Sequence, residues 1–263
     1  VTASGFSLTG PDAGNYAVAN ATASSSADIT ARSLTVTATA NNKVYDGNVV
    51  ATVNFSDDRV GGDGVTVNHS AAVFDDKNVG PAKPVSISGL SLSGADAGNY
   101  NLANTSAASS ADITVRALTV SALAANKVYD GNTDAVVTLA DDRISGDALT
   151  VSHTAAAFAT KNAGTAKPVT VSGISMTGAE AGNYSLANAT AIGNADITPA
   201  ALTLTGLAAS NKVYDATTAA TLSGTASVGG VLLSDVVTVS GGVGSFADKN
   251  IGTAKPVAVS GLT

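Results

Sequence analysis

The sequence contains no cysteine and no tryptophan, and it has only two histidines and one methionine among its 263 residues. Without cysteine the chain forms no disulfide, no thiolate metal site and no cysteine nucleophile. Aromatic residues make up 4% of the chain, and the apolar runs are too short for a transmembrane helix. We therefore expect no membrane insertion. No signal peptide is recognisable, so any export signal is expected outside these residues.

Charge is also scarce, because charged residues make up 13% of the chain. The net charge of −7 and the pI of about 4.6 disfavour nucleic acid or an anionic membrane as partner. Small residues dominate the composition: 50 Ala, 31 Thr, 28 Ser and 27 Gly form just over half of the sequence. The many Thr and Val residues favour strands around Ala-rich cores.

Several motifs recur along the chain with a period of 84 residues. The motif KVYDGN at Lys43–Asn48 returns at Lys127–Asn132, and as KVYDAT at Lys212–Thr217. DAGNY (EAGNY in its last copy), ADIT and AKPV recur with nearly the same spacing. A period of this length is too long for a solenoid turn and suits a small independent domain.

The short junctions between ADIT and the next Leu-Thr segment set the domain boundaries. We predict the C-terminal part of a preceding repeat at 1–31, repeat 1 at 32–115, repeat 2 at 116–199 and the N-terminal part of repeat 3 at 200–263. Val1–Ser7 aligns with Val257–Thr263, so the chain starts and stops at the same phase. Two interpretations stay open. In the first, the sequence is a segment of a longer chain. In the second, repeats are completed head to tail, so that Gly5–Thr30 of one molecule fills the incomplete repeat of the next.

The pattern within each repeat predicts strands and turns. Leu34, Val36 and Ala38 alternate with threonines, as expected for a half-buried strand. Clusters of Gly, Asn and Asp separate the predicted strands roughly every ten residues, which is typical of an all-β sandwich. The further strands predicted for repeat 1 are Ala51–Phe55, Val65–Asn68, Val85–Ser88, Tyr100–Ala103 and Ala111–Thr114.

The tyrosine of the DAGNY motif points to an immunoglobulin-like (Ig-like) sandwich. The pattern D-x-G-x-Y, with a core position two residues later, matches the tyrosine corner of that fold, in which the hydroxyl bonds to nearby upstream backbone. A tandem array of such sandwiches with short junctions predicts an elongated, semi-rigid rod. The alternative is a β-grasp-like α+β repeat in which GADAG extends into a helix. The tyrosines given structural roles are Tyr16, Tyr100 and Tyr184 in this motif, and Tyr45, Tyr129 and Tyr214 in KVYD.

KVYDGN, followed by FDDKNVGPAKPVSISGLSLSGADAGNYNLAN and then ADIT, resembles the YDG-type repeats of very large bacterial surface and secreted adhesins. Many of those are filamentous-haemagglutinin-like proteins exported by two-partner secretion. The resemblance covers the whole chain and implies an extracellular stalk or fibre of stacked β domains, with no catalytic residues. The third copy departs from the pattern, since Ala216 replaces Gly47 and Gly131. This replacement predicts that the turn needs no positive φ.

No set of residues predicts an enzyme or a bound cofactor. His69 and His153 occupy one repeat position, where the third copy has Gly241, so we interpret them as solvated residues at strand ends. Calcium is the one metal that the oxygen ligands would suit, but no D-x-D-x-D loop is present. The weak calcium candidates are Asp57, Asp58, Asp63, Asp75 and Asp76, and a linker ion would use Asp28, Asp112 and Asp196.

The recurring lysines have two interpretations. Lys43, Lys127 and Lys212 stand near Asn or Thr in KVYD, so a Lys–Asn isopeptide bond is one hypothesis. The other is an edge-strand lysine that discourages aggregation. For the whole chain, we expect a non-enzymatic extracellular stalk or fibre. The alternative is that the repeats themselves bind a glycan or a host protein.

Overall fold

A computed structural model describes residues 1–20, 22–232 and 235–263. The described residues contain strands and three short 3-10 helices but no α-helix, so the prediction of an all-β chain is confirmed. None of these elements is a helix long and apolar enough to cross a membrane. The chain divides into two compact units, Val1–Arg116 and Ala117–Thr263.

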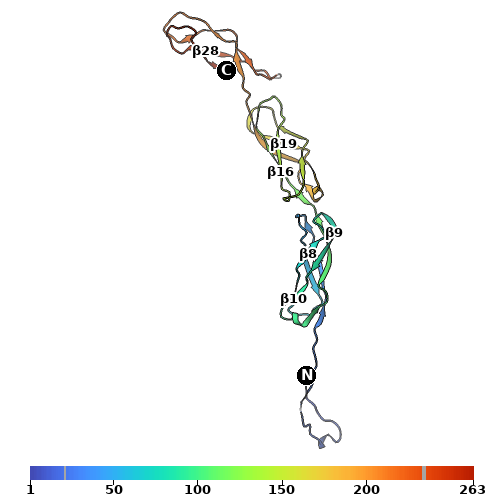
Figure 1. Cartoon of the computed structure of the whole chain (residues 1–263). Helices are drawn as coiled ribbons and strands as arrows, with labels where there is room; N and C mark the ends of the chain where they lie inside the picture. Colours follow the sequence, from blue (N-terminus) through green and yellow to red (C-terminus); the bar gives the residue numbers. More distant parts are fainter. Residues whose placement is uncertain (21, 233–234) are drawn as a thin grey trace. The chain divides into compact units, whose positions relative to one another are not determined.

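Repeat 1 has ten strands and one 3-10 helix, all within the first unit (Figure 1). In chain order they are β3 (Arg32–Leu34), β4 (Val36–Ala40), β5 (Lys43–Val44), β6 (Val53–Asp57), β7 (Thr66–Asn68), β8 (Ala71–Phe74), β9 (Gly80–Ser88), β10 (Ser91–Ser93), η2 (Ala97–Asn99), β11 (Tyr100–Leu102) and β12 (Ser106–Thr114).

Repeat 2 has the same elements in the same order. They are β13 (Arg116–Leu118), β14 (Val120–Ala124), β15 (Lys127–Val128), β16 (Val137–Asp141), β17 (Thr150–Ser152), β18 (Ala155–Phe158), β19 (Gly164–Ser172), β20 (Ser175–Thr177), η3 (Ala181–Asn183), β21 (Tyr184–Leu186) and β22 (Thr190–Thr198).

The two flanking parts have shorter strands. Residues 1–31 contain β1 (Thr2–Ser4), η1 (Ala13–Asn15) and β2 (Thr22–Ser24). Repeat 3 contains β23 (Thr203–Thr205), β24 (Ala208–Ala209), β25 (Ala219–Ala220), β26 (Leu222–Ser223), β27 (Ser227–Gly229), β28 (Gly241–Phe246) and β29 (Val257–Leu262).

A four-stranded sheet is the centre of each complete repeat. Its order is β5-β12-β9-β8 in repeat 1 and β15-β22-β19-β18 in repeat 2. The long strand β12 is antiparallel to β9 and parallel to β5. The hairpin-like pair β4–β6 packs against this sheet, and the Ala40 N–H donates to Ser109 Oγ at 2.9 Å. The β-grasp alternative is wrong, because the GADAG segment forms only the three-residue helix η2.

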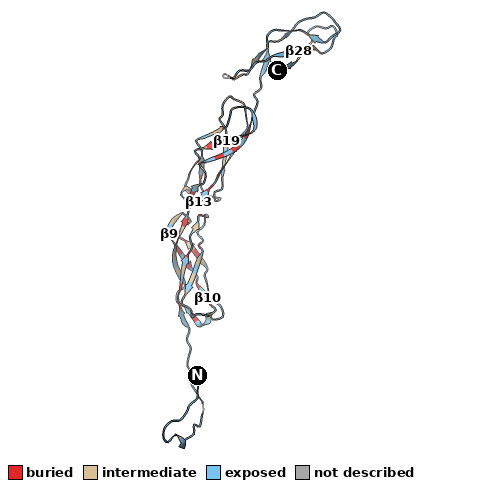
Figure 2. Cartoon of the chain, turned by 180° about the vertical axis from the view of Figure 1, so that it is seen from behind, coloured by how far each residue is buried: buried red, intermediate tan, exposed pale blue. Residues whose placement is uncertain are grey.

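The alternating pattern of β3 and β4 packs as predicted. Leu34 and Val36 are buried at 0% and 2% exposure, while the threonines between and after them face solvent. Burial concentrates on the strands around β9 and β19, whereas the residues around β28 are mostly exposed or intermediate (Figure 2). In repeat 2 the ADIT strand supplies the centre of the core: Ile197, 1% exposed, lies in one cluster with Phe158 and Val169.

Tyr100 does not form the local tyrosine corner that the sequence suggested. Its hydroxyl accepts a hydrogen bond from the Val60 N–H at 2.9 Å and donates to the Asp63 carboxylate, 40 and 37 residues upstream. Tyr184 makes the same bonds within repeat 2. The hydroxyl therefore ties the strand after each 3-10 helix to the distant loop that follows β6 or β16. Tyr16, the third tyrosine of this motif, is 75% exposed.

Replacing Tyr184 with Phe keeps the ring but removes the partner of the Asp147 carboxylate and the Ile144 N–H, which lie 2.6 and 2.9 Å from the hydroxyl. We expect the free energy of unfolding of repeat 2 to fall by about 1–3 kcal/mol. Denaturant unfolding of the full chain measures this loss, with Tyr16→Phe as the exposed control. An unchanged midpoint for Tyr184→Phe would remove the stabilising role assigned to the hydroxyl.

The expectation from Ala216 that the KVYD turn needs no positive φ is wrong. Gly47 and Gly131 have φ of 79° and 82°, and Ala216 has φ of 61°. All three copies thus adopt the left-handed conformation, which is strained for alanine and not for glycine. Asp215 holds the third turn by accepting the N–H of Thr217 at 3.0 Å.

Candidate functional site: an open strand groove in repeat 3

The KVYD motif closes a loop around its own lysine. Lys127 Nζ lies 2.8 Å from Asp130 Oδ1, 2.9 Å from Asn132 Oδ1, 3.0 Å from the Asn132 carbonyl oxygen and 2.9 Å from the Asp134 carbonyl oxygen. It also lies 5.4 Å from the centroid of the Phe158 ring. Lys127 therefore stands on the edge strand β15, as one interpretation expected, and its ammonium is a counter-ion that holds its own loop.

The same loop forms in the other repeats around Lys43 and Lys212. Lys43 contacts the side-chain oxygen of Asn48 at 3.2 Å, whereas Lys212 contacts the hydroxyl of Thr217 at 3.0 Å. Threonine cannot form the isopeptide bond, yet the loop is unchanged. The motif is thus explained by hydrogen bonding to the ammonium.

The ADIT aspartate stabilises a bulge in the central sheet of its own repeat. The register between β9 and β12 shifts where Ala82 lies opposite Asp112. Ala82 has φ of 46°, and its N–H donates to Asp112 Oδ1 at 2.7 Å. Ala166 and Asp196 repeat this geometry, with φ of 49° and the same distance. The aspartates proposed for a linker ion therefore hold a strained backbone N–H in repeats 1 and 2.

The five weak calcium candidates bind protein groups within repeat 1, and two of them share one lysine. The hydrogen bond from Arg59 lowers the pKa of the Asp57 carboxyl below its usual range. Among the described residues no group of three or more His, Cys, Asp or Glu side chains is placed to hold a metal ion. The partners are Arg59 for Asp57, the Thr35 N–H for Asp58, the Tyr100 hydroxyl for Asp63, and Lys83 for Asp75 and Asp76.

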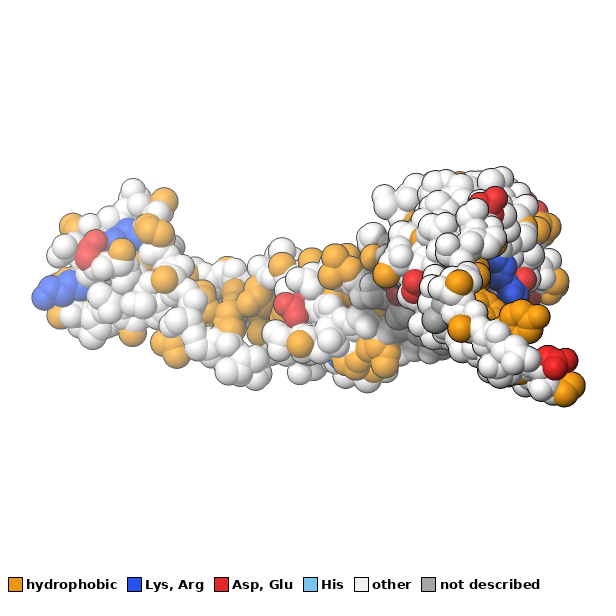
Figure 3. Space-filling view, turned by 90° about the horizontal axis from the view of Figure 1, so that it is seen from below, with side chains coloured by type: hydrophobic (Ala, Val, Ile, Leu, Met, Phe, Trp, Pro, Cys, Tyr) orange, Lys and Arg blue, Asp and Glu red, His pale blue; other side chains and the backbone are white. Residues whose placement is uncertain are grey.

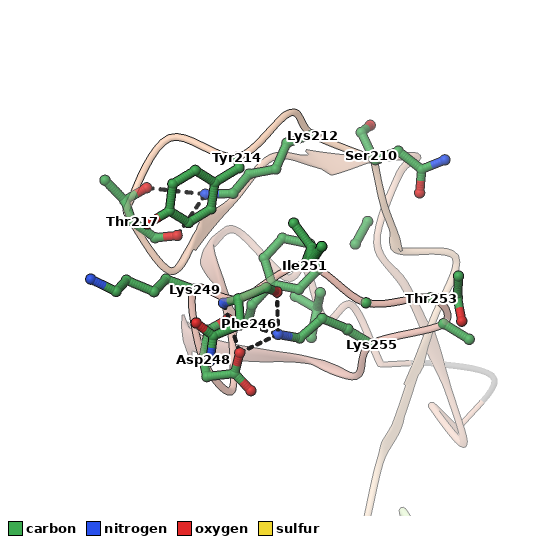
Figure 4. A pocket seen from close by; sticks show the side chains of 16 residues that line it. Ser210, Lys212, Tyr214, Thr217, Phe246, Asp248, Lys249, Ile251, Thr253 and Lys255 are labelled. Carbon is green, nitrogen blue, oxygen red and sulfur yellow. Dashed lines mark hydrogen bonds and ion pairs between the residues drawn. The ribbon is translucent and has the colours of Figure 1, made fainter.

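A groove of about 610 Å³ opens in repeat 3. Lys212 and Tyr214 lie on one wall, and Asp248 and Lys255 lie on the opposite wall (Figure 4). Phe246 and Val257 also line it. Tyr214 is 57% exposed here, whereas its counterpart Tyr45 is fully buried.

The walls of the groove correspond to the strands that hold β22 in repeat 2. There, β22 pairs in parallel with β15 and antiparallel with β19. The counterparts in repeat 3 are Lys212, residues 252–255 and Val257, which line the groove. Ala254 has φ of 52°, as Ala82 and Ala166 do. The groove is therefore lined by counterparts of residues that hold an ADIT strand in repeat 2.

The first ADIT segment, Ala27–Thr30, lies outside the strands. Ile29 occupies the repeat position of Ile113 and Ile197, which are each 1% exposed, but is itself 101% exposed. Just upstream, β2 pairs with the three-residue strand β1.

Repeats 2 and 3 meet at Asp235, which stands at the repeat position of Asp63 and Asp147. The Tyr129 hydroxyl donates to Asp235 Oδ2 at 2.6 Å, and Lys161 Nζ lies 2.8 Å from Oδ1. Hydrogen bonds from Lys161 and then Tyr129 lower the pKa of the Asp235 carboxyl. This aspartate therefore anchors one repeat to the preceding one within the second unit.

Asp235→Asn removes the charge that Lys161 binds, so we expect the junction between repeats 2 and 3 to loosen. The distance distribution between spin labels placed in repeats 2 and 3 should broaden. Asp248→Asn is the control, since its ion pair with Lys255 lies within repeat 3. A distribution that stays as narrow in Asp235→Asn as in the parent chain would contradict this anchoring.

Asp215 should titrate well below an ordinary aspartate. The hydrogen bond from Lys212, with further bonds from Thr217, lowers its pKa from 3.8 to about 2. Because the folded-state value is the lower one, the carboxylate stabilises the loop above about pH 4, and this contribution is lost as the pH falls toward 2. An NMR titration of its carboxyl carbon measures the value, and Lys212→Met should return it toward 3.8. An ordinary pKa in the parent chain would contradict the lysine-closed loop.

The residues that define the groove were not identified from the sequence as a site. Asn211, Ala254 and Lys212 recur at fixed repeat positions, and this recurrence was the available signal. It did not show which residues lie beside one strand, because the two walls are about 40 residues apart in the chain.

Comparison with known protein families matches the YDG domain three times in tandem, at residues 30–108, 114–191 and 198–263. The three matches together cover most of the chain. No curated protein and no solved structure matches it.

Proposed function

Because the chain belongs to the YDG-domain family, we propose that it is a non-enzymatic structural segment of a bacterial extracellular adhesin, at the cell surface or secreted. In this proposal Ig-like sandwich repeats follow one another as a stalk or fibre, which can assemble head to tail. The segment needs no cofactor, and it contacts other repeats rather than nucleic acid or the membrane interior.

The observation that carries this proposal is that the polar residues recurring in the complete repeats are used to hold the fold. Lys127 closes its own loop, and Asp196 holds the bulge. Asn188 binds both backbone groups of Val120, each at 2.9 Å. On the face shown in Figure 3 charged side chains are sparse and scattered. Such an arrangement suits a load-bearing module, since the recurring groups serve stability.

Single-molecule stretching of the full chain tests the structural role. We expect two separate unfolding events, one for each complete repeat, each releasing about 25–30 nm of chain for roughly 84 residues. The forces should be the same with and without calcium. Extension without discrete events would contradict a load-bearing role, and events seen only with calcium would favour the linker-ion hypothesis.

A glycan array probed with the full chain discriminates the alternative in which the repeats themselves bind a ligand. The structural proposal expects no robust binding. Strong, saturable binding to one class of glycan would instead identify the repeats as binding modules.

A further inference from the structure

We propose that each complete repeat bears tension through one seam, along which its first segment runs parallel to its last. In repeat 1 the seam joins residues 32–45 to residues 100–114. In repeat 2 it joins residues 118–129 to residues 187–198. The inference rests on the proposed structural role, and it names the contacts that set the force at which a repeat unfolds.

Backbone ladders form the two ends of the seam in repeat 1. At its start, β3 pairs in parallel with β11, and Arg32 lies opposite Tyr100. At its end, β5 pairs in parallel with β12, and Lys43 lies opposite Ile113. The first and last segments of the repeat therefore point the same way where the seam begins and where it ends.

Side chains continue the seam between these two ladders. Asn104 Nδ2 donates to the Val36 carbonyl at 2.9 Å, and Asn104 Oδ1 accepts the Val36 N–H at 3.0 Å. Ser109 Oγ then accepts the Ala40 N–H at 2.9 Å. The bonded residues are 68 and then 69 positions apart in the sequence, and 70 at the next bond. The two segments thus keep nearly the same register along the whole seam.

The parallel direction of the segments decides how the seam is loaded. The chain continues on both sides of each complete repeat, so tension enters at the start of the first segment and leaves at the end of the last. In a parallel pair these two points lie at opposite ends, and the pull runs along the strands. All bonds of the seam then carry the load together. In an antiparallel pair the two points would lie at one end, and the bonds would break one after another.

Repeat 2 has the same seam with one difference. Asn188 makes both bonds to the backbone of Val120, each at 2.9 Å. Gly193 stands at the repeat position of Ser109, and glycine brings no hydroxyl to accept the N–H of Ala124. The seam of repeat 2 therefore lacks the counterpart of the serine bond. We expect repeat 2 to unfold at the lower force of the two.

Pulling the full chain from chosen points tests the direction of the load. The chain contains no cysteine, so handles attach only where one is introduced. Ala117→Cys with Pro199→Cys places the handles at opposite ends of the repeat 2 seam, and Ala117→Cys with Ser185→Cys places both at its start. All three residues are exposed. The first pair should need a force several times higher at the same loading rate, and equal forces would overturn the inference.

Substitutions provide a second, independent test. Asn188→Ala removes both bonds to Val120, so the unfolding rate of repeat 2 at constant force should rise by about tenfold. Leu149→Ala is the control, because Leu149 is 8% exposed but lies outside both segments. Its cavity lowers the equilibrium stability, and the rate under force should change much less. Chemical denaturation of the same chains measures the stability that each variant loses.

The outcomes separate the seam from the structural role. Ser109→Ala should lower the force of one unfolding event, that of repeat 1, and leave the other unchanged. Leu149→Ala raising the rate as much as Asn188→Ala at equal loss of stability would overturn the seam. Discrete unfolding events would then still support the structural role. Extension without discrete events would overturn both.

Discussion

Ile197→Ala is expected to lower the free energy of unfolding of repeat 2 by about 2–5 kcal/mol, the range for truncating a buried isoleucine. Ile197 is 1% exposed and packs with Phe158, Val169 and Ala124. Small domains are stable by only about 5–15 kcal/mol. The substitution should therefore remove a large share of the stability of the repeat, because the ADIT strand supplies the centre of its core.

The same strand offers a matched control. Ile192 lies on β22 as well, but is 70% exposed, so Ile192→Ala should change stability by no more than about 0.5 kcal/mol. Chemical denaturation of both variants in the full chain, followed by NMR signals from repeat 2, measures the difference. Equal effects at the two positions would show that β22 is not the core strand that the structure describes.

Lys127→Met is expected to lower the free energy of unfolding of repeat 2 by about 2–4 kcal/mol. It removes the cation that is surrounded by one carboxylate oxygen, one amide oxygen and two backbone carbonyl oxygens. The lysine side chain is only 17% exposed, so water replaces it poorly. Methionine preserves much of the apolar contact with Phe158, which isolates the loss of charge. The loop after β15 should open, and its amides should exchange faster with solvent.

Asp130→Asn is the milder variant with which Lys127→Met is compared. It neutralises one of the four oxygen partners and leaves the others, and Asp130 is 46% exposed, so its effect should be clearly smaller. Thermal unfolding measures the loss of stability in each variant, and hydrogen exchange measures the opening of the loop after β15. If Lys127→Met were no more harmful than Asp130→Asn, the lysine would not be the centre of the loop.

Patterns that are local in the sequence predicted the structure well. The alternation at Leu34 and Val36 predicted which face of the strand is buried. The 84-residue recurrence of whole motifs is matched by three YDG domains. The strand predicted at Val65–Asn68 is β7, and that at Ala111–Thr114 forms the end of β12. These features depend on residue spacing within a few positions, which a single sequence displays.

Contacts between distant segments were not predictable in the same way. Tyr100 was assigned a nearby backbone partner, but its partners are Val60 and Asp63 in a loop far upstream. The parallel pairing of β5 with β12 joins residues about 70 positions apart. Period and composition do not encode which loop lies beside a given hydroxyl, since that depends on the packing of the whole repeat.

The groove also depends on such distant pairing. Recurrence marked Lys212 and the ADIT aspartates as important, yet it suggested an isopeptide bond or an ion rather than a lysine-closed loop and a bulge. The prediction from Ala216 failed for a related reason. The hydrogen bonds of Asp215 to Thr217 hold the turn in the left-handed region even without glycine.

Hydrogen exchange measured residue by residue on the full chain tests most directly the claim that an ADIT strand completes each repeat. At concentrations where the chain is monomeric, amides of β12 and β22 should be the most protected of their repeats, and amides of β29 should exchange rapidly. Strong protection of β29, or rapid exchange in β22, would contradict the claim.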